Sequence, residues 1–252
     1  MGQRVVALCL ADPEISLAGA IDHASHPKIG SDAGQVCGSG DAGISISAEL
    51  PSDVGVVIDF SLPEAVDGIV QRCLDAKVPL VIATTGTTEG QRAKIESAAK
   101  TIPIVMAPSM SMAVNLVMKL VSDAAAALKD NAAGVDVEII ERHHRFKEDA
   151  PSGTALHFGK LVAEQMGQTE HVHGRSGRPG QRPSNEIGYH ALRTGDNVGE
   201  HTIVFGLMGE TIDLSVKGHT RDSYAYGAIA AAKFLHDKTS GLYDMADVLN
   251  LN

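Results

Sequence analysis

Apolar runs of strand length alternate with segments of helical length over residues 1–110. The apolar runs lie at 15–22, 43–47, 54–60, 79–83 and 102–106. The segments of helical length lie at 3–11, 63–76 and 88–99. Such alternation is typical of a parallel sheet with helices on both faces. The runs at 54–60 and 80–83 are almost continuously apolar, as strands are when both faces of their sheet are covered.

A different pattern begins near residue 112, where strands follow one another with little helix between them. A helix is predicted at 114–128 and another from Gly153. Strand-like stretches lie at 135–142, 186–193, 200–206 and 211–217. Turn residues at 194–197 and 208–210 separate the last three. We therefore expect an α+β second domain.

The end of the chain predicts a return to the first domain. Residues 223–235 are rich in alanine and helical in pattern, and 241–249 form a compact ending. We expect a dinucleotide-binding domain at 1–111 and 221–252, and a substrate-binding and oligomerisation domain at 112–220. Residues 167–185 are rich in Gly, His, Arg and Pro and are expected to form one long irregular loop.

The densest cluster of candidate chemistry follows the strand at 135–142. It reads Glu141-Arg-His-His-Arg-Phe-Lys147 and then Asp149-Ala-Pro-Ser-Gly-Thr-Ala155. Pro151 suits a first helical turn, and the N–H groups at the start of the helix can bind a carboxylate or phosphate. A histidine can transfer a proton near neutral pH. The cluster therefore predicts a pocket for a small acidic substrate.

Two simpler interpretations of this cluster stay open. His143 and His144 are adjacent, so on a strand they point to opposite faces unless the chain turns there. The cations could then form a solvated basic loop, and Pro151-Ser-Gly-Thr154 could be an ordinary helix cap.

Overall charge and cysteine content narrow the function classes. A formal net charge of −10 disfavours a nucleic-acid partner, which normally needs a basic face. The three cysteines are widely spaced and show no C-x-x-C pairing, which favours a reduced, cytoplasmic protein. No apolar run approaches ~18 residues, and the N-terminus shows no signal pattern, so neither membrane insertion nor export is expected.

The first domain carries part of a dinucleotide-binding pattern. Asp22 ends an apolar run and lies 20 residues after Gly2, the separation expected between a glycine fingerprint and the acid that binds the adenosine ribose. The fingerprint itself is absent, so the first strand and most of the phosphate loop would lie upstream of Met1. Thr84-Thr-Gly86 follows an apolar run and could contact a nicotinamide and its ribose. A turn-capping aspartate and an ordinary strand-to-helix loop remain the alternatives.

These motifs together resemble the dihydrodipicolinate reductase family, which acts in the diaminopimelate route to lysine. The stretch from Glu141 to Ala155 is similar to the long and specific family signature E-x-H-H-R-x-K-x-D-A-P-S-G-T-A. Further matching segments occur in the family's order along the whole chain, and they are Val57-Ile-Asp-Phe-Ser61, Ala83-Thr-Thr-Gly86, Gly199-Glu-His-Thr202 and Gly241-Leu-Tyr-Asp-Met245.

The resemblance implies a role for each matching position. His143 would protonate the ring carbon, with Lys147 as its cationic partner. The substrate would be bound by His144, Gly153, Thr154 and Arg221. The cofactor would be lined by Asp22, His23, Ala83, Thr84, Thr85, Ala107, Pro108, Ser109 and Met110. No metal is implied, and the family is a tetramer assembled through the sheets of its second domain.

Three positions depart from the family pattern. Phe146 stands where many members have a histidine, Ser109 replaces a frequent asparagine, and Ala83 replaces a glycine.

The resemblance implies that hydride passes from NADH or NADPH to C4 of a cyclic imine formed when the 4-hydroxyl leaves as water. Asp22 would repel a 2′-phosphate, so NADH is expected to serve at least as well as NADPH.

Other functional classes remain alternatives on the sequence alone. A different two-domain reductase is the first alternative. A dehydrogenase that forms an acyl-enzyme would need a catalytic cysteine near the His/Lys cluster, and Cys9, Cys37 and Cys73 all lie away from it. A metal hydrolase would need a ligand spacing that His171-Val-His173 does not supply. The non-enzymatic alternative is a nucleotide-binding regulator with the same fold and lost turnover.

Overall fold

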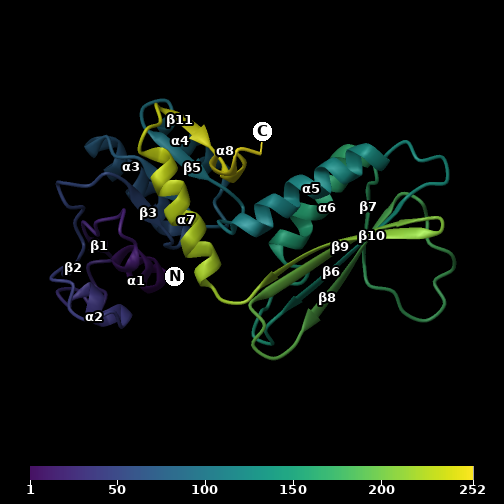
Figure 1. Ribbon diagram of the computed structural model, residues 1–252, viewed down its shortest axis with the longest axis horizontal. Coiled ribbons are helices and arrows are strands. Elements are labelled where there is room, and N and C mark those ends of the chain that lie inside the picture. The colour runs from purple at the N-terminus through teal and green to yellow at the C-terminus, as the bar shows by residue number, and fades with distance from the viewer. Residues whose placement is uncertain (252) are drawn as a thin grey trace. The chain divides into compact units, whose positions relative to one another are not determined.

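The computed structural model describes residues 1–251, and the chain divides into two compact units (Figure 1). The first unit contains Met1–Met112 and the residues from Arg221 onward, and the second contains Ala113–Thr220. Each unit has its own apolar core.

A parallel sheet of four strands forms the centre of the first unit, in the order β11-β5-β4-β3. Its strands are β3 (Val57–Asp59), β4 (Leu80–Ile82), β5 (Pro103–Met106) and β11 (Gly241–Tyr243). Every residue of β4 is buried, which explains its continuous apolar sequence. Since the strands are parallel, their carboxyl ends meet at one edge, and the segments after β3, β4 and β5 are brought together there.

A second, two-stranded parallel sheet pairs β1 (Ala20–Ile21) with β2 (Ile46–Ser47). The apolar run at 15–22 is thus a strand only at its end, and the prediction of a long strand there was wrong. Ala20 and Ile21 are the residues of that run that find a partner in β2, and a strand needs a neighbour for its backbone hydrogen bonds.

Helices cover both faces of the four-stranded sheet, as the alternating pattern predicts. The helices of this unit are α1 (Gly2–Ala11), α2 (Ala33–Cys37), the 3₁₀ turn η1 (Pro63–Ala65), α3 (Val66–Ala76), α4 (Glu89–Ala98), α7 (Asp222–Leu235) and α8 (Met245–Leu249). One core cluster joins α3 and α4 to the sheet, and another joins α7 and α8 to it. The end of the chain joins this sheet, since β11 pairs with β5.

The second unit is a mixed sheet of five strands with two helices on one face. The order β10-β9-β6-β8-β7 places β6 (Asp136–His143) at the centre. The other strands are β7 (Glu170–His173), β8 (Glu186–Arg193), β9 (Gly199–Leu207) and β10 (Glu210–Gly218), and β6 pairs with β8 and β9. The helices α5 (Met112–Leu128) and α6 (Gly153–Met166) share one apolar core with the sheet. The predicted α+β architecture is therefore correct.

Alternation along β6 separates two faces of this sheet. Val137, Ile139, Glu141 and His143 are buried, while the residues between them are exposed or partly exposed. We call the helix-covered side the inner face. Arg193 of β8 lies opposite His143, and His201 of β9 lies opposite Glu141. Register therefore places four ionisable side chains on the inner face, among apolar neighbours.

Two details of the second unit differ from the sequence-based expectation. Residues 167–185 are not irregular throughout, because Glu170–His173 pair in parallel with β8 as strand β7. Pro151 is not in the first helical turn either. Ser152 is the N-cap of α6 and accepts a hydrogen bond from the N–H of Ala155, so Pro151 lies before the helix.

None of the helices among residues 1–251 combines the length and apolar character needed to cross a bilayer.

Gly227 allows α7 to pack against the segment that follows β5. A Cβ built on Gly227 would lie 1.7 Å from the carbonyl oxygen of Met110. Gly227→Ala should therefore destabilise the first unit by about 1–3 kcal/mol, the usual effect of overpacking. Gly68→Ala is the matched control, since Gly68 lies in α3 and its Cβ would meet open space. It should be neutral or stabilising by up to ~1 kcal/mol. Thermal unfolding of both variants tests this, and equal melting temperatures would contradict it.

Candidate active site

His143 is the last residue of β6 and keeps strand geometry up to its carbonyl oxygen, which accepts the N–H of Thr194. Beyond it the chain turns, since the N–H of Lys147 bonds to the carbonyl of His144. His143 and His144 therefore do not lie on opposite faces of one strand, as a continued strand would require. His143 is 8% exposed, and its ring faces the inner side of the sheet.

Glu141 orients this histidine. The two side chains share a face because they are two residues apart on a strand, and Nδ1 of His143 lies 2.6 Å from Oε2 of Glu141. This bond leaves Nε2 as the ring nitrogen that can serve a reacting group. Gly199 makes room for Nε2: a Cβ there would approach it to 3.0 Å, and the φ of 152° also favours glycine.

The Glu141 carboxylate, 1% exposed, has four donors. Arg193 contributes a two-pronged contact, with Nη1 2.8 Å from Oε2 and Nη2 2.8 Å from Oε1. The N–H of Ser152 donates to Oε1 at 3.0 Å, and His143 donates from Nδ1. Burial of the carboxylate without such donors would be strongly unfavourable. The side chain therefore joins the ends of β6 and β8 to the start of α6.

Opposing effects set the protonation of the pair. Burial alone would raise the pKa of Glu141, but the bonds from Arg193, His143 and Ser152 hold that pKa below its ordinary value. Burial lowers the pKa of His143, Glu141 opposes this, and the positive charges of Lys147 and Arg193 add to the lowering. A carboxylate and an imidazole that can transfer a proton therefore lie in contact.

His201 packs against His143 without a charge of its own near neutral pH. The two rings meet edge to face with centroids 5.3 Å apart, and His201 also lies against Phe158 of α6. Ser152 Oγ is 3.0 Å from Nε2 of His201. Burial lowers the pKa of His201 to about 4, and the charge on His143 contributes. His201 is therefore a neutral neighbour of the His143 ring.

Lys147, His144 and the start of α6 complete the cluster. Lys147 Nζ is 2.8 Å from Asp149, whose pKa this contact lowers. Nδ1 of His144 is buried with no hydrogen-bond partner among the described residues. Gly153 and Thr154 carry the first N–H groups of α6, which a helix leaves without internal acceptors. A Cβ on Gly153 would meet open space. These groups can receive a small anion.

The segments at the carboxyl edge of the first unit are tied together by Asp59. This buried carboxylate ends β3 and accepts the hydroxyl of Thr84 at 2.7 Å. The N–H of Ala83 donates to the Asp59 carbonyl, and the N–H of Ser61 donates to Oδ1. Thr85 is exposed and is followed by Gly86 with φ 76°. The Thr84 hydroxyl is thus occupied within the protein, while Thr85 is open to a ligand.

The remaining first-unit candidates also lie at strand ends. After β5, Ala107 and Met110 are buried and Pro108 is exposed. After β1, the Asp22 side chain is 49% exposed, with Oδ1 accepting the N–H of His23. Exposed acceptors after β1 and open backbone after β4 and β5 fit the ribose hydroxyls and the carboxamide of a nicotinamide dinucleotide. The cofactor roles assigned to these positions from the sequence stay predictions.

Arg221 and the His143 cluster belong to different units of the chain. Arg221 belongs to the first unit, at the N-cap of α7, where its carbonyl accepts the N–H of Tyr224. Its predicted substrate role stays a prediction.

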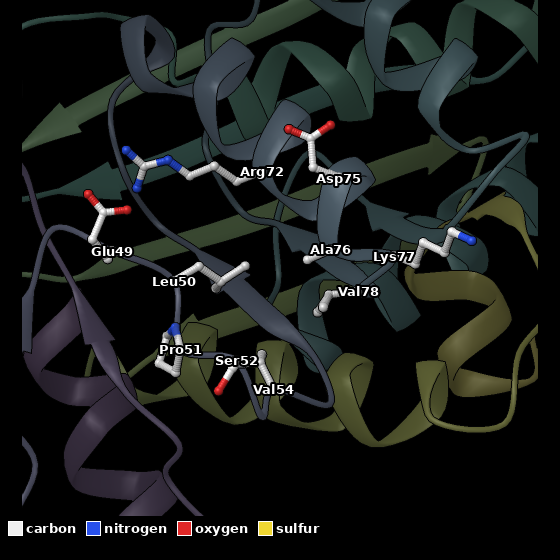
Figure 2. A pocket seen from close by; sticks show the side chains of 10 residues that line it. All are labelled: Glu49, Leu50, Pro51, Ser52, Val54, Arg72, Asp75, Ala76, Lys77 and Val78. Carbon is white, nitrogen blue, oxygen red and sulfur yellow. The ribbon is translucent and has the colours of Figure 1, made fainter.

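A hollow of about 470 Å³ lies elsewhere in the first unit, between the segment after β2 and the end of α3 (Figure 2). Figure 2 shows that the charged side chains around it include Arg72, Asp75 and Lys77. Val78, another lining residue, precedes β4, so the hollow lies at the amino end of the strands. It therefore lies at the opposite end of the strands from the segments that follow β3, β4 and β5. Within residues 1–251, no group of three or more His, Cys, Asp and Glu side chains has an arrangement that could hold a metal ion.

Several residues of the site carry no role in the sequence-based assignment. They are Asp59, Glu141, Ser152, Arg193 and His201. The position of Glu141 two residues before His143 was the available signal, since it predicts a shared face. Arg193 and His201 lie about fifty residues or more along the chain, and the strand register that aligns them cannot be read from local sequence.

The low pKa of His201 predicts a pH-dependent stability. In the folded protein this pKa is about 4, and the ordinary value is 6.5. Between these values the unfolded chain binds a proton that the folded chain does not, so stability is lost as pH falls from 6.5 towards 4, by up to ~1.4 kcal/mol per pH unit. His201→Asn should flatten this slope, while His236→Asn, at an exposed position, should leave it unchanged. Urea unfolding at several pH values measures the slope; the same slope in both variants would refute the assignment.

Comparisons with known proteins identify the family. Residues 1–110 match the family described as dihydrodipicolinate reductase, N-terminus, and residues 113–249 match dihydrodipicolinate reductase, C-terminus. The chain is 58% identical to 4-hydroxy-tetrahydrodipicolinate reductase of Rhodopirellula baltica, over 100% of this chain and 93% of the relative. It is 44% identical to the enzyme of the same name from Rubrobacter xylanophilus, over 99% and 94%.

A solved structure gives the same fold. It is titled dipicolinate-bound dihydrodipicolinate reductase from Paenisporosarcina sp. TG-14, with TM-score 0.76 and 24% identity, over 98% of this chain and 94% of that one. The chain is a pyridine-nucleotide-dependent reductase that converts 4-hydroxy-tetrahydrodipicolinate in diaminopimelate and lysine biosynthesis. Nothing in these comparisons favours a regulator without turnover. The two matched halves and the close whole-length relatives show that the chain belongs to the dihydrodipicolinate reductase family.

Proposed function

We propose that His143 is the proton donor of the reduction and that Lys147 is its cationic partner. The observation that supports this is the buried His143–Glu141 contact, which leaves Nε2 of the histidine available. Loss of the 4-hydroxyl as water gives a conjugated cyclic imine. Hydride addition at C4 then leaves an enamine, which must take a proton at the neighbouring carbon. His143 in its protonated form supplies that proton, and Lys147 stabilises the negative charge that develops on the ring.

The substrate carboxylates are assigned to the start of α6. The N–H groups of Gly153 and Thr154 point out of the first turn, and a helix N-terminus favours anions by ~0.3–1 kcal/mol, with more from charged hydrogen bonds. His144 supports this assignment because its buried Nδ1 has no partner among the described residues. Arg221 is a further, cationic candidate for binding a substrate carboxylate. Planar dianions such as pyridine-2,6-dicarboxylate should bind at the same groups.

The cofactor is assigned to the carboxyl edge of the first unit. A reduced nicotinamide dinucleotide supplies the hydride when it is bound. Asp22 and His23 would hold the adenosine ribose. The nicotinamide end would be lined by Ala83, Thr84, Thr85, Ala107, Pro108, Ser109 and Met110. In this arrangement the protein binds and orients the cofactor, and the redox chemistry belongs to the cofactor.

Assembly and location belong to the same proposal. The outer face of the second-unit sheet exposes Ile140 and Leu192, each 40% exposed, which suits the homotetramer that the resemblance implies. The three free cysteines are consistent with a reducing compartment, and we assign the protein to the cytoplasm.

Removal of the proton donor should slow turnover without weakening cofactor binding. His143→Gln should lower kcat by roughly 10²-fold or more, since general acid catalysis contributes ~10²- to 10⁴-fold. Lys147→Ala should raise the KM for the substrate and lower kcat. His190→Gln is a matched control, because His190 also pairs with a glutamate, Glu138, at 2.7 Å but on the outer face. Steady-state kinetics measure kcat and KM, and an NADH titration of each variant checks that cofactor binding is unchanged. Near wild-type turnover of His143→Gln would remove this residue from the mechanism.

Cofactor preference should follow the charge of Asp22. The wild-type protein should use NADH at least as well as NADPH, because a carboxylate repels a 2′-phosphate. Asp22→Asn should raise the kcat/KM ratio of NADPH to NADH by at least about tenfold, equivalent to ~1.4 kcal/mol. Asp53→Asn, an exposed loop position, should leave the ratio unchanged. A strong NADPH preference in the wild-type protein would overturn the role of Asp22.

A further inference from the structure

We propose that Glu141, held by Arg193, is a positioning residue that fixes the tautomer of His143 and joins it to the start of α6. The inference rests on the proposed role of His143 as proton donor. It adds two residues, Glu141 and Arg193, to which no substrate contact is assigned.

The first observation is the geometry of the carboxylate. Oε2 of Glu141 is 2.6 Å from Nδ1 of His143, and Oε1 is 3.0 Å from the backbone nitrogen of Ser152. One carboxylate thus contacts both the proton-transferring ring and the N-cap of the helix whose first N–H groups are assigned to the substrate. A rotation of the Glu141 side chain would disturb both contacts together.

The second observation is that Glu141 cannot rotate freely. Arg193 binds both oxygens, and Nη2 of the same guanidinium donates to the carbonyl of Asp149 at 2.6 Å. A planar fork of this kind fixes a carboxylate in angle as well as in position, which a lysine cannot do. Arg193 therefore also anchors the loop that carries Lys147 and Asp149.

The third observation concerns protons. A carboxylate accepts only, so Nδ1 of His143 must carry hydrogen, and the proton that is given away must be the one on Nε2. The ionisable groups around this ring are Glu141 from β6, Arg193 from β8, His201 from β9 and Lys147 from the loop. Among them only Glu141 favours the protonated form that a general acid needs, because the other three are cationic or neutral.

The experiment compares Glu141→Gln with the wild-type protein. A glutamine amide can donate to Nδ1 and so impose the other tautomer, with hydrogen on Nε2 of a neutral ring. We expect kcat to fall by roughly 10²-fold. His143 must be protonated to act, so activity is lost as pH rises through its pKa. Without the Glu141 charge that limb of the pH profile should move to lower pH by about one unit or more.

Glu138→Gln is the matched control. Glu138 also lies on β6 and is also bound by arginines, Arg175 and Arg182, but its contacts do not include His143. Its loss should leave kcat and the pH profile as in the wild-type protein. If Glu138→Gln produced the same defect, the effect would come from losing any paired carboxylate in this strand, and the proposal would be overturned.

A double-mutant cycle separates positioning from general structural support. If Glu141 acts through His143, then Glu141→Gln should have no further effect on kcat in a His143→Gln background. Multiplying defects would overturn the inference. Wild-type kinetics of Glu141→Gln beside an inactive His143→Gln would also overturn it and leave the proposed function intact, whereas an active His143→Gln would defeat the proposed function itself.

Arg193→Lys covers the case in which Glu141→Gln does not fold. It retains the positive charge beside Glu141 but loses the two-pronged contact. We expect a smaller fall in kcat, about tenfold, with substrate KM also raised because the loop at Asp149 loses its anchor. An unchanged kcat in a folded Arg193→Lys protein would overturn the inference.

Discussion

The buried Glu141 carboxylate is the interaction on which the rest of the second unit's chemistry depends. Taking a carboxylate out of water costs several kcal/mol unless donors surround it. The fold supplies four, from the ends of two strands and the start of one helix. Each donor either has a role in the proposed reaction or lies beside a group that has one. The need to satisfy one buried charge thus fixes the relative positions of His143, the start of α6 and the loop that carries Lys147.

Strand register accounts for how these groups meet. The pairing of β6 with β8 and with β9 places Arg193 and His201 across from His143 and Glu141, and alternation turns all four to the inner face. In the first unit a simpler rule applies, because parallel strands end at one edge. Asp59 there repeats the logic of Glu141: a buried carboxylate at a strand end holds the neighbouring segment through the Thr84 hydroxyl. In both units a buried carboxylate holds the segments near a strand end together.

Much of this architecture can be predicted from local sequence, for reasons that are physical. Periodicity locates β6 and the strands 186–193, 200–206 and 211–217 closely, because half-buried strands must alternate. The predicted helices are also found, since caps such as Thr88 mark their starts. The strand β7 was missed because Glu170–His173 offers little apolar alternation. The run at 15–22 was overextended because apolar residues alone do not provide a strand with a partner.

The candidate site also has a part that local sequence predicts and a part that it does not. His143, Lys147 and Gly153-Thr154 lie within twelve residues, so a motif can reveal them, whereas Arg193 and His201 enter through long-range pairing.

The location of the proton on His143 tests the central claim most directly. It can be measured by NMR of protein labelled with ¹⁵N-histidine, with the His143 signals assigned from their absence in a His143→Gln sample. The account predicts that above its pKa His143 carries hydrogen on Nδ1, bonded to Glu141, with Nε2 bare. Hydrogen on Nε2 with a bare Nδ1 would contradict it.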